Sequence, residues 1–143
     1  MLATSTENGI NSLRFLLKTE QENYSTQTDC VYLNQLKQEL LTYMQGKLTL
    51  FTVPLEITGT DFQKKVWKEL QQIPYGKSIS YKELAQKINQ PKATRAVGGA
   101  NNKNKLHILI PCHRVIGANN QLVGYAGGLE NKKWLLETEQ NFM

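Results

Sequence analysis

Cysteine and histidine are scarce in this sequence, which has two of each among 143 residues. Two cysteines are too few for the disulfide framework of a small secreted protein, and they suit a reducing compartment, so we expect a cytoplasmic protein. A zinc site built from these side chains would have to draw on Cys30, His107, Cys112 and His113. Their spacing matches no common zinc pattern, and adjacent Cys and His rarely bind the same ion. We therefore predict no metal and no cofactor.

Long apolar runs are also missing. Glu7, Asn11 and Arg14 interrupt the first twenty residues, so we expect neither a signal peptide nor a membrane-spanning helix there, and no membrane partner. Hydrophobic residues make up 40% of the chain and charged residues 20%, which argues against disorder and against a coiled coil. The composition is that of a globular protein.

Positive charge is in moderate excess, with 17 Lys and Arg against 12 Asp and Glu, a net charge of +5. This balance suits a polyanionic partner such as nucleic acid. Many small basic proteins bind no nucleic acid, so charge alone leaves the partner open.

The front of the chain predicts a small α/β domain over residues 1–57. Two short strands, 2–6 and 10–17, flank an Asn8–Gly9 turn, and apolar spacings of three and four predict a helix over 29–45. The first strand begins abruptly at Leu2, so we expect a reduced sheet that is completed by packing against the rest of the chain.

Residues 58–143 predict a mainly helical domain. Two capping boxes, Thr60–Gln63 and Ser80–Glu83, open helices at 60–73 and 80–88. A short helix of small residues follows at 92–100, which gives a helix-turn-helix pattern. Two short packed helices are also common in proteins that never touch DNA, so the pattern is only moderately specific. A last helix is predicted over 129–140, anchored by Trp134, Leu135 and Leu136.

The one plausible nucleophile stands directly after an apolar run. Ile108–Ile110 predicts a short buried strand that Pro111 ends, and Cys112 and His113 follow. A free thiol has a pKa of about 8.5, so a cysteine that attacks carbon at neutral pH needs a base nearby. Adjacent side chains diverge on extended backbone, so we expect His113 to reach the thiol through a bridging water. Its other ring nitrogen needs an acceptor, for which the last helix offers Glu130, Glu137 and Glu139.

Each of these residues also has an ordinary structural interpretation. Cys112 could be a small core residue and His113 its polar neighbour. Taken singly, Tyr81 would be a tyrosine at the edge of the core and Arg95 a solvated arginine. Asn101–Asn104 would form a polar loop, and Lys132 and Lys133 would lie on helix faces turned to water.

Several spaced motifs taken together resemble the methylated-DNA–protein cysteine methyltransferases. The likeness extends from about residue 60 to 139, and the front segment resembles the family only loosely. The motifs, in chain order, are Tyr81 after its serine cap, Ala93–Ala100 with Arg95, Pro111–Gly117, Gly124–Gly128 and Lys133–Leu136.

The resemblance implies an α/β (α+β) protein with a winged-helix-like second domain and a short active-site strand. It implies irreversible, single-turnover transfer of an alkyl group from O6-alkylguanine in double-stranded DNA to Cys112, with O4-alkylthymine left open as a second substrate. The damaged base would be flipped out of a duplex bound through the minor groove. A monomer is expected.

By the same resemblance, His113 takes the thiol proton and Glu139 orients the histidine. Asn104 braces the active-site strand, and Tyr81 contacts the flipped base and donates a proton. Arg95 inserts into the stack, with Ala93, Ala96 and Gly98 beside it on the DNA-binding helix. The implied substrate pocket consists of Arg114, Val115, Tyr125 and Ala126.

The sequence departs from the family pattern at a few places. Lys105 stands where proline is frequent, and Gln140 stands where glycine is usual. Some members carry a zinc in the front domain, but this front segment offers only Cys30 as a ligand. Two rival functions remain: a noncatalytic module that recognises DNA lesions, as in relatives without the cysteine, and a helix-turn-helix regulator, for which no effector region is evident.

Overall fold

The computed structural model describes residues 1–16, 19–20 and 29–143. The fold is mixed α/β, with a small front sheet and one helix followed by a mainly helical part, as predicted. Two single-turn 3-10 helices, Cys112–Arg114 and Ala118–Asn120, lie in the second part. The strands and α-helices in chain order are β1 (Leu2–Thr6), β2 (Gly9–Arg14), α1 (Val31–Met44), α2 (Asp61–Leu70), β3 (Ile79–Ser80), α3 (Tyr81–Lys87), α4 (Thr94–Asn102), β4 (Val115–Ile116) and α5 (Leu129–Asn141).

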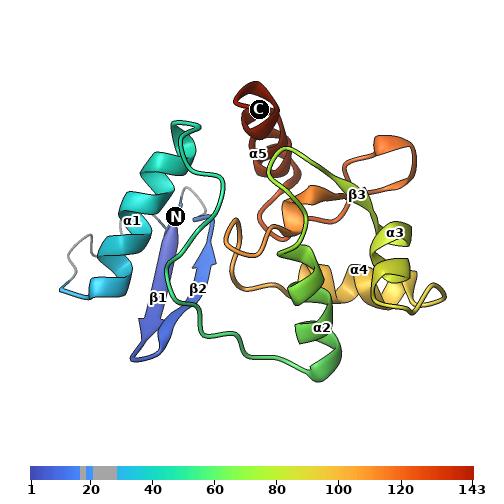
Figure 1. The fold of residues 1–143 in the computed structure, drawn as a ribbon, viewed down its shortest axis with the longest axis horizontal. Coiled ribbons are helices and arrows are strands. Elements are labelled where there is room, and N and C mark those ends of the chain that lie inside the picture. The colour runs from blue at the N-terminus through green and yellow to red at the C-terminus, as the bar shows by residue number, and fades with distance from the viewer. Residues whose placement is uncertain (17–18, 21–28) are drawn as a thin grey trace.

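The front sheet is the predicted hairpin, with β1 antiparallel to β2 and α1 beside them (Figure 1). The strands meet at a two-residue turn that precedes Gly9. Gly9 has φ +149°, and a Cβ there would lie 2.5 Å from the carbonyl oxygen of Pro54, so the position requires glycine. The strand predicted to reach Leu17 is observed to Arg14, and Leu17 itself lies outside the described residues.

Both predicted capping boxes are present and fix the starts of α2 and α3. In the first, Thr60 accepts from the backbone of Gln63 at 3.1 Å, and the Gln63 side chain accepts from the backbone of Thr60 at 3.0 Å. Helices α2, α3 and α4 then pack together around fully buried Val66, Leu84 and Val97. The pair α3–α4, predicted as a helix-turn-helix, lies on the far side of the molecule from the hairpin (Figure 1).

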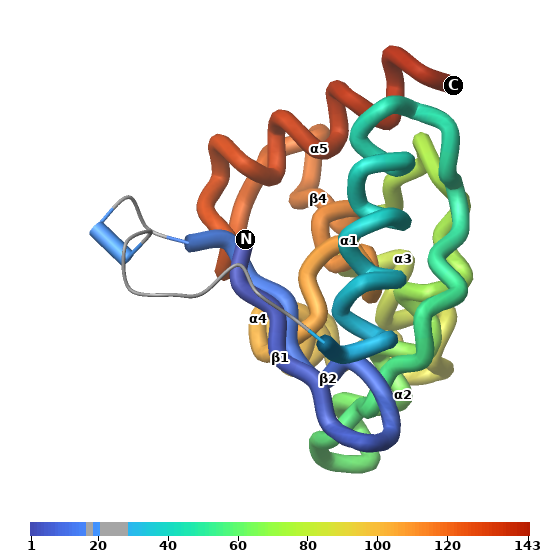
Figure 2. The backbone as a smooth tube through the Cα atoms, turned by 90° about the vertical axis from the view of Figure 1, so that its left-hand side faces the viewer, coloured from blue at the N-terminus to red at the C-terminus, as the bar shows by residue number. Residues whose placement is uncertain are grey.

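Strand β2 holds the segment that leads to Cys112. The backbone N–H of Leu13 donates to the carbonyl of Lys105 at 2.8 Å, and the N–H of His107 donates to the carbonyl of Leu13 at 3.0 Å. Figure 2 shows the hairpin running beside this part of the chain. The front segment is therefore a direct support of the segment that carries the candidate nucleophile.

The strand predicted at Ile108–Ile110 does not form, and the prediction is wrong. Ile108 has φ +70°, and the N–H groups of Leu109 and Ile110 donate to the carbonyls of His107 and Leu106 in tight turns. The predicted burial is right, since all three residues are at most 6% exposed. A short apolar run reports burial rather than extension. The short strand follows the cysteine instead, where β4 pairs in parallel with β3.

Helix α5 buries only part of the face that the sequence predicted, since Leu135 is buried and Leu136 half-buried. Trp134, expected as an anchor, is 45% exposed, while Lys132, Leu135 and Glu139 are completely buried. Lys132 was expected to face water, so that prediction is also wrong. Within the described ranges, no helix combines the length and the apolar character needed to cross a membrane.

Candidate active site

Cys112 opens the single-turn helix that follows Pro111, and its side chain is 2% exposed. The backbone N–H of Cys112 donates to the carbonyl of Ile110 at 2.7 Å. The side-chain amide of Asn104 donates to the cysteine Sγ at 3.1 Å. The tight turn and the amide together fix where the sulfur lies.

Asn104 also braces the turn before the cysteine. Its amide nitrogen lies 2.8 Å from the carbonyl oxygen of Ile110, and its amide oxygen accepts from the backbone of Leu106 at 2.9 Å. Asn104 is 5% exposed, so these are buried, specific contacts. The bracing role implied for Asn104 has this geometry, although the braced segment is a turn rather than a strand. Asn101, expected in a polar loop, lies in α4 and is also buried, with its amide 3.4 Å from the Cys112 carbonyl.

The structure brings His113 to Glu139 and to neither of the other glutamates considered. The Nε2 atom of His113 lies 2.8 Å from Oε2 of Glu139, and both side chains are buried. Glu137 is exposed on the same helix, and Glu130 lies exposed in its first turn. Cys112, His113 and Glu139, the series implied by the resemblance, are therefore present as two adjacent residues and one hydrogen-bond partner.

The charge on Glu139 determines which nitrogen of His113 carries the proton. Burial alone would raise the pKa of Glu139, but hydrogen bonds and charge from His113 and Arg114 outweigh it and lower the pKa to about 2. An ionised carboxylate only accepts, so Nε2 of His113 must donate. Burial also lowers the pKa of His113, which leaves the ring neutral at pH 7. Nδ1 therefore has a free lone pair, and this buried atom makes no hydrogen bond to any described residue.

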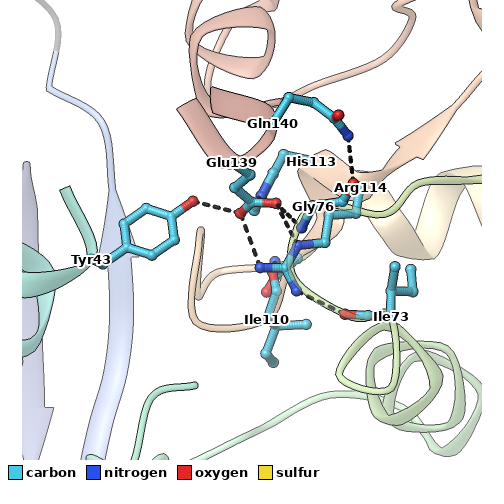
Figure 3. Close-up of polar contacts among 9 residues, drawn as sticks. Tyr43, Ile73, Gly76, Ile110, His113, Arg114, Glu139 and Gln140 are labelled. Atoms are coloured by element: carbon cyan, nitrogen blue, oxygen red, sulfur yellow. Dashed lines mark hydrogen bonds and ion pairs between the residues drawn. The ribbon is translucent and has the colours of Figure 1, made fainter. Parts of the chain in front are cut away.

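Glu139 is the centre of a wider set of contacts (Figure 3). Arg114 donates Nε and Nη2 to the two carboxylate oxygens, each at 2.9 Å, and Nη1 to the carbonyl of Ile73 at 2.8 Å. Tyr43 of α1 donates its hydroxyl to Oε2 at 2.6 Å, and the backbone of Gly76 donates to Oε1 at 3.3 Å. The resemblance placed Arg114 in the substrate pocket. Its guanidinium is instead committed to the carboxylate that orients His113.

The thiol itself is held protonated. Burial raises the pKa of Cys112 to about 11, against the opposing effects of the Asn104 hydrogen bond and the charge of Lys132. Lys132 is completely buried, and its ammonium donates to the carbonyls of Val115 at 2.5 Å and Val123 at 3.0 Å. Burial lowers the pKa of Lys132 to about 8. A neutral thiol next to a neutral imidazole requires that the proton move as the sulfur attacks.

Lys132 and Tyr43 are the buried residues of this site that sequence reasoning missed. A signal for Lys132 does exist, because it precedes Leu135 by three positions and Glu139 by seven and so shares their buried helix face. Tyr43 carries no comparable local signal, since its partner lies 96 positions away.

Tyr81 connects α3 to the loop beyond β4. Its hydroxyl lies 3.1 Å from the carbonyl oxygen of Val123 and 3.3 Å from that of Gly124. The ammonium of Lys132 lies 5.9 Å from the centre of its ring. Burial raises the pKa of Tyr81, and a thiolate at Cys112 would raise it further, so the phenol keeps its proton at neutral pH.

A groove of about 520 Å³ opens beside the thiol-bearing turn. Ala126, implied as a pocket residue, lines it together with His107 and Phe15 of the front segment. The ring of Tyr125 packs 5.4 Å from that of His107. Val115 lies in β4, and its carbonyl accepts from Lys132. The full lining is Ser12, Arg14, Phe15, Asn104, Lys105, His107, Ala126 and Gly127.

The implied DNA-binding residues share α4 and its first turn. Arg95 and Ala96 are exposed, while Ala93 and Gly98 are half-buried. A Cβ added to Gly98 would lie 3.8 Å from the Tyr81 ring, an ordinary contact distance, so Gly98 of α4 and Tyr81 of α3 are neighbours. Arg95 is therefore an exposed cation on the same helix as Gly98, which lies against Tyr81.

Comparison with known proteins decides the family. Residues 61–141 match the family model described as 6-O-methylguanine DNA methyltransferase, DNA binding domain, and residues 2–57 match its ribonuclease-like domain. A methylated-DNA–protein-cysteine methyltransferase of Methanosarcina mazei is 44% identical over 99% of this chain and 90% of its own length. The chain belongs to the 6-O-methylguanine DNA methyltransferase family.

Solved structures of this methyltransferase family share the fold. The Mycobacterium tuberculosis protein OGT, crystallised in complex with DNA, is 42% identical with a TM-score of 0.86, over 98% of this chain and 86% of that one. Schizosaccharomyces pombe Atl1, in complex with damaged DNA containing O6-carboxymethylguanine, is 30% identical with a TM-score of 0.50, over 58% of this chain and 79% of that one. Among the residues that the structure describes, no group of three His, Cys, Asp or Glu side chains could hold a metal.

Proposed function

We propose that this methyltransferase repairs DNA by moving a methyl or larger alkyl group from O6 of guanine to the sulfur of Cys112, once per protein molecule. The buried Cys112–His113–Glu139 series is the observation that carries the proposal. Family membership and the DNA complex of a relative that is 42% identical support DNA as the substrate.

The chemical step follows from the protonation states. Nδ1 of His113 takes the thiol proton, through a bridging water, as the sulfur attacks the alkyl carbon. A sulfur–carbon bond forms, the bond between that carbon and O6 breaks, and its electron pair stays with the guanine. Tyr81, which keeps its proton at neutral pH, supplies the proton that lets guanine leave as a neutral base. The thioether has no route back to a thiol.

The base must leave the duplex before this step, because an atom inside the stack cannot reach a buried sulfur. We propose that α4 binds the minor groove and that the exposed guanidinium of Arg95 fills the gap in the stack. The flipped base would enter beside Tyr125 and Ala126, of which Ala126 lines the groove. We further propose that the protein acts as a monomer in the cytoplasm.

The first test is intact-mass spectrometry after mixing the protein with duplex DNA that carries O6-methylguanine. One methyl adduct on Cys112, saturating at one per protein, is expected. Cys112→Ala should form no adduct and still bind the duplex, while Cys30→Ala, which removes the other cysteine, should react like the parent. Tight binding by the parent without an adduct would instead favour a noncatalytic lesion-binding protein.

The role of Arg95 is tested by comparing two substrates. Arg95→Ala should slow transfer from duplex DNA more than transfer from free O6-benzylguanine, because only the duplex leaves a gap to fill. Lys37→Ala, an exposed cation on α1, is the matched control. Equal losses on both substrates would contradict the intercalating role.

A further inference from the structure

Tyr43 connects the front segment to the reaction chemistry. It lies on α1, is completely buried, and donates its hydroxyl to Oε2 of Glu139 at 2.6 Å. Figure 3 shows the ring reaching the carboxylate from the side away from Gly76 and Arg114. A phenol that crosses between the two parts of the chain to bind one carboxylate oxygen is not needed for packing alone.

The oxygen that Tyr43 binds is the one that holds His113. Oε2 accepts from Tyr43 at 2.6 Å, from His113 at 2.8 Å and from Arg114 at 2.9 Å. Charge-assisted hydrogen bonds draw negative charge toward each donor, so every added donor weakens the pull of the carboxylate on the others. Tyr43 cannot give up its proton, because burial and the charge of Glu139 raise its pKa far above neutrality. It therefore acts only as a donor.

We propose that Tyr43 is a positioning residue of the relay: its hydroxyl fixes Oε2 of Glu139 and keeps the carboxylate from holding a proton on His113 too strongly. This inference rests on the proposed function, since it concerns the base that activates Cys112. It gives the front segment a part in the chemistry beyond supporting the thiol-bearing turn.

The direction of the effect follows from the required state of His113. The ring must be neutral to accept the thiol proton, so transfer slows as pH falls through the pKa of His113. Without the Tyr43 hydroxyl, Glu139 attracts the imidazolium more strongly and the pKa of His113 rises. The other titratable or charged groups that face this centre are unchanged by the substitution. They are Arg114 from the turn after Cys112, His107 from the segment before Cys112, Tyr75 from the loop before β3, Tyr125 from the loop before α5, and Lys132 from α5 itself.

The test compares Tyr43→Phe with Tyr75→Phe. The Tyr75 ring packs edge-on against Tyr43 at 6.0 Å and lies 5.7 Å from the Arg114 guanidinium, but its buried hydroxyl makes no hydrogen bond to any described residue. Both variants lose one buried oxygen from the same cluster. Only Tyr43→Phe loses a contact to the carboxylate, so the pair separates positioning from packing.

Two readouts are taken on each variant. The pKa of His113 is followed by NMR of the ring protons, and the rate of transfer from free O6-benzylguanine is followed by mass spectrometry across pH. Tyr43→Phe should raise the pKa of His113, and the pH at which the rate falls, by on the order of one unit. Tyr75→Phe should leave both unchanged.

The outcomes separate this inference from the proposed function. An unchanged His113 pKa in Tyr43→Phe, or equal shifts in both variants, would overturn the role of Tyr43 even if every protein is alkylated normally. An absence of any adduct on the parent would instead overturn the proposed function. Urea unfolding of both variants checks that each is folded where the rates are measured.

Discussion

Glu139→Gln gives the most direct measure of what the buried carboxylate contributes. Glu139 pairs with both side-chain nitrogens of Arg114 that face it, and neither side chain is more than 8% exposed. The substitution keeps the shape but leaves the Arg114 charge without its counter-ion. Removing one partner of a buried pair costs about 3–5 kcal/mol of stability. At a urea dependence of about 2 kcal/mol per molar, the unfolding midpoint should fall by about 2 M.

The lowered pKa of Glu139 gives a second measure of how much its contacts contribute to the free energy of unfolding, and the two values are similar. It falls from 4.5 to about 2 on folding, which at about 1.4 kcal/mol per unit corresponds to about 3 kcal/mol. A lowered carboxyl pKa stabilises the fold above the unfolded value, so this contribution is fully present above about pH 4.5 and is lost as pH falls through 2. Glutamine does not titrate. The stability gap between parent and variant should therefore be widest at pH 6 and shrink steadily toward pH 2.

The assay is urea unfolding at pH 6, 4 and 3, followed by tryptophan fluorescence, with Glu137→Gln as the control. Glu137 lies on the same helix with a 61% exposed side chain, 3.9 Å from Lys133, and an exposed pair of this kind contributes less than about 1 kcal/mol. If Glu139→Gln unfolds within 1 kcal/mol of this control, the assignment of a tightly held buried carboxylate is wrong. A gap that stays constant between pH 6 and 3 would refute the pKa argument separately.

Three further variants test other parts of the site. Lys132→Met removes the buried charge that lowers the thiol pKa, so transfer should slow by about tenfold, whereas Lys133→Met, on the exposed face, should not change the rate; equal rates would contradict the electrostatic role. Asn104→Ala loses the contacts to the sulfur and the turn, so we expect a loss of about 1–3 kcal/mol in urea unfolding and slower alkylation, and an unchanged midpoint would argue against the brace. Gly127→Ala would place a Cβ within 2.6 Å of a Tyr125 ring atom and should slow reaction with O6-benzylguanine, while Gly99→Ala, which meets nothing within 4 Å, should not; matching rates would separate the groove from substrate binding.

The sequence predicted elements well wherever local chemistry decides them. Both capping boxes begin helices at the expected residues because a side chain and a backbone N–H three positions apart satisfy each other regardless of the rest of the fold. The hairpin and α1 also lie within a few residues of their predicted ranges over the described part. The run Ile108–Ile110 was misread because burial, which hydrophobicity reports, does not specify φ and ψ, and here Ile108 adopts a left-handed turn.

Site residues close to Cys112 in the sequence could be predicted, whereas those that the fold brings to it from distant segments could not. Cys112, His113 and Asn104 lie within ten positions, so their proximity follows from the sequence, and the choice of Glu139 came from the family resemblance. Lys132 was misplaced because a charged side chain is assumed to reach water unless a partner is known. The resemblance placed Arg114 in the substrate pocket, whereas its guanidinium binds Glu139.

Which residue a buried side chain binds depends on three-dimensional packing, as Tyr43 shows most clearly. A tyrosine at helical spacing among leucines predicts only a core position, and its ring is indeed buried. Its hydroxyl needs a hydrogen-bond partner once buried, and that requirement could have been stated from the sequence. The partner could not, because it lies on a helix 96 residues later. A buried tyrosine with no local acceptor is therefore a reason to look for a distant carboxylate, and in this chain the carboxylate is the one that orients the base.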